Sequence, residues 1–165
     1  MLSFNSQGVQ FNVRAAAVIL EDGCLLLHRA EGDDIWVLPG GRVEPGEAAA
    51  NATAREMMEE TGQSIECEGL AFCVENFFKW QGQPSHELGY YFYASLPSGS
   101  RLSDKQRSHE AREGDQRLEY RWFEVTGLTK LALYPEFLRT ARFDKQAPAQ
   151  HVVQGIPDQR PAGDA

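Results

Sequence analysis

Short apolar blocks recur along the chain and predict strands on both sides of one central helix. The predicted strands cover residues 13–19, 24–28, 64–74, 88–96 and 118–125. The Glu21-Asp22-Gly23 turn predicts that the first two strands form a hairpin, and residues 81–87 are expected to connect the third and fourth. In the last strand, alternation makes Tyr120 and Trp122 candidates for the inward face.

Residues 47–60 predict the central helix because they are rich in Ala, Met, Glu and Arg, which favour helix. The residues of its expected buried stripe, at i, i+4 and i+7, are Ala50, Ala54 and Met57. Thr61-Gly62 supplies a C-terminal stop. Helical spacing predicts a second helix over residues 131–143, with the helix proper starting near Pro135.

The remaining segments are polar or rich in turn residues. Residues 97–116 hold almost no large apolar side chain, which predicts a loop or a flexible lid. Residues 145–165 are expected to form a flexible C-terminal tail. The Gly40-Gly41 pair permits close backbone approaches that a Cβ would block. Together these elements predict an α/β or α+β fold, a mixed sheet sandwiched between helices, in a single domain over residues 1–144.

Composition and charge narrow the class of protein. The chain has 165 residues, of which 42% are hydrophobic, so it can bury a core without a disulfide scaffold. Its net charge of −8 disfavours general binding to nucleic acid or to an anionic membrane, because both require a basic surface. The N-terminal residues lack the basic and apolar regions of a signal peptide, and the three cysteines lack metal-binding spacing. These features indicate a cytoplasmic protein with reduced thiols.

Half of the net charge lies within residues 41–67, where six glutamates oppose two arginines. Such a run is usually a solvated helix face, but Glu56, Glu59 and Glu60 stand at i, i+3 and i+4 and would share one face. Like charges at that spacing destabilise a helix, whereas Mg²⁺ and Mn²⁺ prefer carboxylate oxygens. The pattern therefore predicts a divalent-cation site, in which Arg55 can orient a carboxylate by a forked hydrogen bond.

Two roles are open for Glu47, which is expected to begin the same helix. It could support the cation site from that end, or it could favour the helix N-terminus through the macrodipole. Glu44, in the preceding loop, is expected to be a solvated surface charge.

The run from Gly41 to Gly62 resembles the Nudix box, written G-x5-E-x7-R-E-U-x-E-E-x-G-U, where U is a bulky aliphatic residue. The matching positions are Gly41, Glu47, Arg55, Glu56, Met57, Glu59, Glu60 and Gly62. The last position departs because it is Gln63, but that position serves packing and carries no chemistry. The flanking segments that also resemble the family's strands are residues 14–19, 27–29, 36–40 and 119–124.

The resemblance implies a hydrolase that cleaves the diphosphate linkage of a nucleoside diphosphate joined to another group, with Mg²⁺ or Mn²⁺ as cofactor. It implies that Glu56, Glu59 and Glu60 bind the metal. The backbone carbonyl of Gly40 would add a ligand, and Arg55 would orient the carboxylates. Glu56, Glu59 and Arg55 are then the catalytic residues. Metal ions would bridge the acidic site and the anionic pyrophosphate and would activate a water.

The general base is left open, because in this family it is either a box glutamate or a residue of a distant loop. Glu110, Glu113 and Glu119 are the distant candidates, and each is otherwise an ordinary exposed charge. A second class of function is also open, in which the fold binds a nucleotide as a non-catalytic regulator. The intact metal-binding glutamates argue against that alternative.

Substrate choice in the family depends on residues outside the box. Arg29 could contact a phosphate or pair with an acid. A base could stack on Trp80 or Phe78, although aromatic residues of strands are more often core. The pair His86-Glu87 could reach the pocket, or it could form a turn. The resemblance implies a small-molecule nucleotide as partner and, in many members, a homodimer. The open substrates are nucleoside triphosphates, ADP-ribose, nucleotide sugars and dinucleoside polyphosphates.

Overall fold

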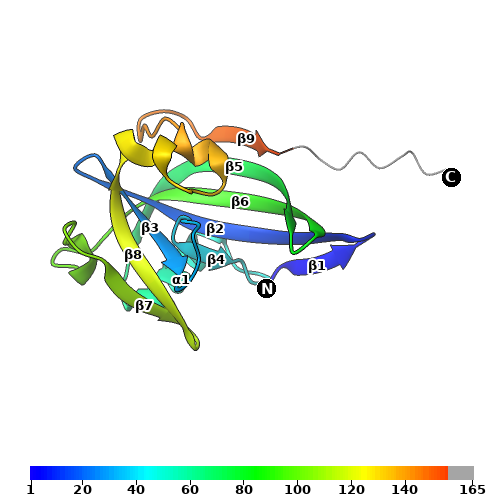
Figure 1. The fold of residues 1–165 in the computed structure, drawn as a ribbon, viewed down its shortest axis with the longest axis horizontal. Helices are drawn as coiled ribbons and strands as arrows, with labels where there is room; N and C mark the ends of the chain where they lie inside the picture. The colour runs from blue at the N-terminus through cyan, green and yellow to red at the C-terminus, as the bar shows by residue number, and fades with distance from the viewer. Residues whose placement is uncertain (156–165) are drawn as a thin grey trace.

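The computed structural model describes residues 1–155 and shows one α-helix and nine strands within them. The strands are β1 Ser3–Ser6, β2 Val9–Glu21, β3 Cys24–Ala30, β4 Gly40–Arg42, β5 Glu66–Trp80, β6 Gln83–Ser95, β7 His109–Glu113, β8 Gln116–Glu124 and β9 Gln150–Gln154. The sheet order is β7-β8-β3-β2-β6-β5-β9, and β1 and β4 also pair with β2 (Figure 1). β2 runs parallel to β6, and β5 runs parallel to β9, while the other pairs are antiparallel. The predicted mixed sheet is confirmed.

The β2–β3 hairpin is also confirmed, with Asp22 and Gly23 at positive φ in its turn. The two strands pair only next to that turn and then diverge. β4 fills the gap by pairing with β2, where Gly41 lies opposite Ala15. This divergence places the loop before the helix in the middle of the sheet.

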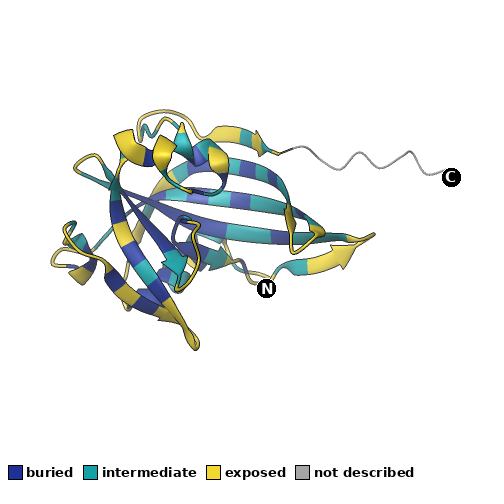
Figure 2. Cartoon of the chain, in the orientation of Figure 1, coloured by how far each residue is buried: buried dark blue, intermediate teal, exposed yellow. Residues whose placement is uncertain are grey.

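Residues 15–19 of the central strand β2 are buried (Figure 2). Alternate residues of this stretch enter two cores on opposite faces of the sheet. Val18 belongs to the core that the segments after β8 cover with Leu138. Ile19 belongs to the other core, with Met57 of the helix and Tyr120 of β8. The predicted inward positions of Tyr120 and Trp122 are therefore confirmed, because both side chains are buried.

Helix α1 spans Ala49–Thr61, so the predicted start at residue 47 is wrong by two positions. Ala48 is still extended, and Glu47 lies outside the helix. The predicted stop is confirmed, because Gly62 is left-handed with a φ of 70° and its N–H donates to the carbonyl of Met58. The predicted stripe is right only at Met57, since Ala50 and Ala54 are half-buried. The buried positions are Ala52, Thr53, Met57, Glu60 and Thr61.

The second predicted helix, over residues 131–143, is wrong. The chain there forms only a 3₁₀ turn at Glu136–Arg139, after another at Val125–Lys130. The intervening backbone is extended because the carbonyl of Ala132 accepts the N–H of Trp36 at 2.8 Å. Within the described chain, α1 covers one face of the sheet and 3₁₀-helical segments cover the other.

Three segments predicted to be loops contain strands. Residues 97–116 contain a 3₁₀ turn and β7. The turn between β5 and β6 is only Gln81-Gly82, so residues 83–87 belong to β6. Residues 150–154 of the predicted tail form β9, while residues 156–165 lie outside the described chain. β7 and β9 occupy the two ends of the sheet order, where one exposed side allows polar sequences. No helix of residues 1–155 is long and apolar enough to cross a membrane.

Candidate active site

A cleft of about 920 Å³ opens over the middle of β2. Gly41 and Glu56 line it on the side of β2 where β4 pairs. Glu87 and Phe78 line it on the side where β6 and β5 follow. Arg14 of β2 lies between these two sets, so the cleft joins the predicted metal site to a second, more aromatic region.

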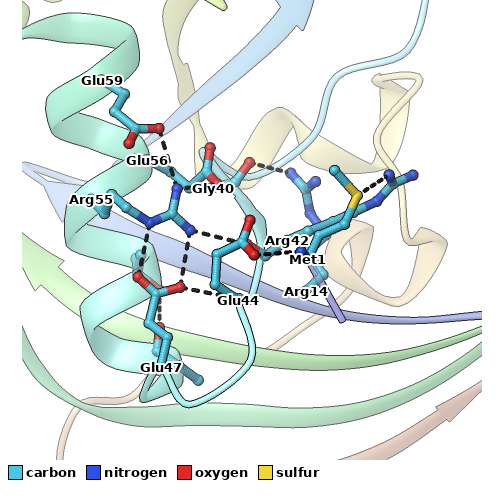
Figure 3. A network of polar contacts seen from close by, with 11 residues as sticks. Met1, Arg14, Gly40, Arg42, Glu44, Glu47, Arg55, Glu56 and Glu59 are labelled. Atoms are coloured by element: carbon cyan, nitrogen blue, oxygen red, sulfur yellow. Dashed lines mark hydrogen bonds and ion pairs between the residues drawn. The ribbon is translucent and has the colours of Figure 1, made fainter. Parts of the chain in front are cut away.

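Arg55 is the centre of a network of carboxylates at the edge of this cleft (Figure 3). Its Nε and Nη2 donate to the two oxygens of Glu47 at 2.8 and 3.0 Å. Its Nη1 donates to Glu56 at 2.8 Å and to Glu59 at 3.2 Å, and Nη2 also reaches the carbonyl of Arg42. The hydrogen bonds from Arg55 lower the pKa of Glu47, and the carboxylates of Glu47 and Glu56 raise the pKa of Arg55. Arg55 thus gathers and orients glutamates from the loop and from two turns of α1.

Glu47 supports the carboxylate network from the loop before α1, through its contacts with Arg55. Its Oε2 accepts the backbone N–H of Glu44 at 3.0 Å as well as the Nη2 of Arg55. Because it fixes Arg55 from the loop, it acts on the other carboxylates through that guanidinium. Glu44 is half-exposed and pairs with the amino group of Met1, in keeping with the expected surface charge.

The glycine pair is needed for the approach of β4 to its neighbours. Gly40 has a φ of 145°, and a Cβ there would overlap the backbone of Ala15. A Cβ on Gly41 would occupy the position of the carboxylate of Glu56. The predicted close approach is confirmed, and it sets Glu56 against the floor of the cleft.

Glu60 points away from Arg55 and into the protein. Its carboxylate accepts a hydrogen bond from the hydroxyl of Tyr120 and lies 3.5 Å from Nδ1 of His28. Burial raises the pKa of Glu60 to about 7, against which the hydrogen bond from Tyr120 and the charge of Arg14 act. Burial, aided by Arg14, lowers the pKa of His28 to about 3, so this contact is no ion pair at neutral pH. Neither ring nitrogen of His28 has a hydrogen-bond partner in the described chain.

The three glutamates predicted to bind metal are therefore divided between two environments. Within residues 1–155 no three Asp, Glu, His or Cys side chains converge as a preformed metal site. Glu56 nevertheless lies in an open cleft beside the carbonyl of Gly40, and both offer hard oxygen atoms. Mg²⁺ keeps several waters and is often bound by one or two carboxylates together with substrate phosphates. The residues present fit such a water-rich site.

Of the distant candidates for the general base, Glu113 alone lines the cleft. Glu119 accepts hydrogen bonds from Arg29 and Ser108. Glu110 is exposed and lies opposite Glu119 in the β7–β8 hairpin. The structure therefore separates three residues that look equivalent in the sequence.

Arg29 lies in the cleft, but its guanidinium is already engaged. Its Nε and Nη2 contact Glu119 at 2.9 and 2.8 Å, and its Cζ stands 4.5 Å from the ring centre of Trp36. Of the two alternatives, the structure contains the pairing with an acid. Phe78 and Trp80 also line the cleft, and Trp80 is 62% exposed, so it is not core.

Two neighbours of the site, Arg14 and Tyr134, were not predicted from the sequence. Arg14 donates from Nη2 to the carbonyls of Leu38 and Gly40, at 3.2 and 2.9 Å. Tyr134 and Glu87 line the cleft. For Glu87 two alternatives were open, contact with the pocket or a turn with His86, and the structure contains the first, because Glu87 lies in β6 and lines the cleft. The alternation of Glu87 with Tyr91 favours that alternative, since both residues fall on one face of the strand.

Comparison with known proteins agrees with this geometry. Residues 10–143 match the NUDIX domain family. A Bacillus subtilis protein provisionally named an 8-oxo-dGTP diphosphatase is 33% identical over 87 residues, covering 53% of this chain and 54% of that protein. A human 8-oxo-dGDP phosphatase is 29% identical over 124 residues, covering 74% of this chain and 34% of that protein. The chain thus spans about half or less of the length of these relatives.

Solved structures show the same fold. The crystal structure of a MutT NUDIX hydrolase from Burkholderia pseudomallei is 28% identical and has a TM-score of 0.54. The similarity covers 70% of this chain and 84% of that chain.

Proposed function

This chain belongs to the Nudix family, and from that membership and the site geometry we propose that it is a metal-dependent hydrolase of a nucleoside diphosphate joined to another group. The observation that carries the proposal is the network in which Arg55 gathers Glu47, Glu56 and Glu59 at the edge of a cleft. Folding gains little from crowding carboxylates on one helix face. The names of the related phosphatases, which act on oxidised guanine nucleotides, support the same class of reaction.

Glu56, Glu59 and the carbonyl of Gly40 would hold Mg²⁺ or Mn²⁺, with Glu60 as a further ligand from the buried side. When bound, the metal would neutralise phosphate charge and lower the pKa of a coordinated water. Arg55 keeps the two glutamates oriented, because its guanidinium donates to both Glu56 and Glu59. Arg14 adds a fixed positive charge to the floor of the cleft, held there by two backbone carbonyls.

We assign the general base to Glu113. Its carboxylate belongs to the cleft lining and is exposed to water. Burial is the main cause of the raised pKa of Glu60, and the negative charge of Glu113 raises it further. This effect supports a position of Glu113 close to Glu60. Glu113 would accept the proton of the attacking water.

Hydrolysis of a nucleotide panel tests the proposal. The panel holds damaged and normal nucleoside triphosphates, ADP-ribose, nucleotide sugars and dinucleoside polyphosphates, each with Mg²⁺ or with a chelator. We expect turnover that vanishes with chelator and returns with Mg²⁺ or Mn²⁺. Glu56→Gln should reduce kcat by about 10²-fold or more, whereas Glu66→Gln, an exposed carboxylate of β5, should not.

The alternative is a regulator that binds a nucleotide without hydrolysing it. It would show binding to the same panel but no release of product from any member at any metal concentration. That result would contradict the proposed hydrolase. The observation that favours this alternative is the position of Glu60, which contacts Tyr120 and not Arg55, so that no three metal-binding side chains converge within residues 1–155.

A further inference from the structure

A row of three polar side chains lies across the sheet, on the face of β2 away from the helix, and one of them, Glu87, lines the cleft. The strand register pairs Asn12 of β2 with Glu87 of β6, and Glu87 with Asn76 of β5. Asn12 is 7% exposed and Asn76 is 1% exposed, whereas Glu87 reaches the cleft. Polar groups in the interior of a sheet cost stability unless they have partners. This row is therefore a candidate for recognition of a ligand.

Glu87 is only partly satisfied by the protein. Its Oε2 accepts a hydrogen bond from Nδ2 of Asn12 at 2.7 Å. Within residues 1–155, its Oε1 has no hydrogen-bond donor and neither oxygen pairs with Lys, Arg or His. Beside it, the buried Oδ1 of Asn76 also lacks a partner. Asn76 does not line the cleft, so the acceptor that the row presents to a ligand is the carboxylate of Glu87.

Aromatic rings surround this acceptor. Phe78 and Tyr134 meet edge to face with ring centres 5.8 Å apart, and both line the cleft. Tyr91 lies on the same strand face as Glu87, and its ring lies so close to Gly89 that a Cβ there would press against it. Burial, followed by the charge of Glu87, raises the pKa of both Tyr91 and Tyr134. Flat apolar surfaces next to one carboxylate suit a planar heterocycle with N–H donors.

Charge sets the direction in which a nucleotide would lie. Arg14 is paired with Gly89, so it occupies the next row of the same face, and Glu56 lies across β2. Phosphates are attracted to Arg14 and to cations held at Glu56, and they are repelled by Glu87. The base therefore belongs at Glu87 and the phosphates at the box.

We propose that Glu87 selects a guanine-type base by accepting hydrogen bonds from its Watson–Crick edge, with the ring against Phe78 and Tyr134. This inference rests on the proposed function for its assumption that the ligand is a nucleotide. An ionised carboxylate only accepts hydrogen bonds. Guanine offers N1–H and N2–H₂ side by side, hypoxanthine offers N1–H alone, and adenine offers a donor beside an acceptor. Of these three bases, only guanine offers a donor to each of the two carboxylate oxygens.

Calorimetric binding of the α,β-methylene triphosphates of guanosine, inosine and adenosine, with Mg²⁺, tests this without hydrolysis. The wild type should bind them in that order, losing about tenfold or more in affinity for each lost donor. Glu87→Gln places a donor beside an acceptor, which matches adenine. It should weaken guanosine binding by about tenfold or more and strengthen adenosine binding.

Glu75→Gln is the matched control, because Glu75 lies on the opposite face of β5 and contacts His151 at 2.8 Å. It should leave the order of the three analogues unchanged. The inference is overturned if the wild type shows no order among them, if it binds none, or if Glu87→Gln weakens all three equally. Hydrolysis without base preference would overturn the inference and leave the proposed function standing. Base preference without hydrolysis would support the inference and contradict the proposed hydrolase.

Discussion

Glu60 and His28 lie side by side in the interior, and folding transfers a proton between them. In the unfolded chain their ordinary pKa values are 4.5 and 6.5, so between these pH values the histidine carries the proton. In the folded chain, burial raises the pKa of Glu60 to about 7 and lowers that of His28 to about 3, so the carboxyl carries it. The folded and unfolded states therefore each bind one proton at these two groups. Between pH 4.5 and 6.5 the pair does not make the free energy of unfolding depend on pH.

Glu60→Gln should make the free energy of unfolding depend on pH, because it removes the carboxyl that carries the proton in the folded state. The remaining His28 has a folded pKa below its unfolded value, so the free energy of unfolding falls as the pH drops below 6.5. Relative to the wild type, the variant should lose about 2–3 kcal/mol between pH 6.5 and 4.5. Urea unfolding at both pH values, in chelator, measures this difference. If the free energy of unfolding of the variant and of the wild type changes equally with pH, the proton does not move from His28 to Glu60 on folding.

Gly41 can be tested through the space that it leaves for Glu56. In Gly41→Ala the new Cβ displaces that carboxylate, so kcat/KM should fall by about 10²-fold while the fold persists. Gly127→Ala is the control, because a Cβ there meets nothing within 4 Å. Kinetics and thermal unfolding of both variants decide the matter. Equal activity in the two would show that Glu56 needs no fixed position.

At the scale of elements, the sequence predicts the buried strands and α1, but its helical spacing also predicts a second helix over residues 131–143 that does not form, and the edges of the sheet are not predicted. β2, β3 and β8 are apolar because neighbours cover them, so their sequences predict them. β7 and β9 lie at the ends of the sheet and carry mostly polar residues, so their pairing depends on tertiary contacts. The box could be read almost completely because its residues are contiguous. The sequence does not predict that Glu60 points away from Glu56 and Glu59. Its hydrogen-bond donor, Tyr120, lies 60 positions away in the chain.

The β7–β8 hairpin carries a prediction about catalysis. Glu113→Gln should lower kcat by about 10²-fold or more with little change in KM, because the residue is assigned the proton of the attacking water. Glu110→Gln, an exposed change in the same strand, should have no effect on either constant. Steady-state kinetics and the pH profile of kcat measure both. If the two variants behave alike, the base lies elsewhere.

At the scale of the whole molecule, the cleft joins segments that only the completed sheet brings together. Glu56, Glu87 and Tyr134 come from a helix, a distant strand and a covering segment. No local pattern predicts the register that sets Glu87 beside Asn12, because the two strands are parallel and 75 positions apart. The sequence therefore offers Phe78 and Glu87 as separate candidates for the pocket, but it does not predict that they lie together with Tyr134.

β9 is expected to stabilise one wall of this cleft. Its Gln154 accepts the backbone N–H of Phe137 at 2.8 Å, close to Tyr134, and its Val152 packs against the core. Ending the chain at residue 149 instead of 155 should lower the free energy of unfolding by about 2 kcal/mol and weaken nucleotide binding. Urea unfolding and calorimetry compare the two lengths. Unchanged values for both quantities would show that β9 is dispensable.

The parallel pairing of β2 with β6 also sets an order of events during synthesis. A ribosome makes the apolar centre of β2 long before it makes the strand that covers that edge, since Ile19 pairs with Ala94. Until residue 95 has left the exit tunnel, this edge has no lasting partner on that side. Non-local parallel pairing is also slow once both strands exist. The nascent chain should therefore be most prone to aggregation, and most dependent on chaperones, while the box is already complete and the floor beneath it is still missing.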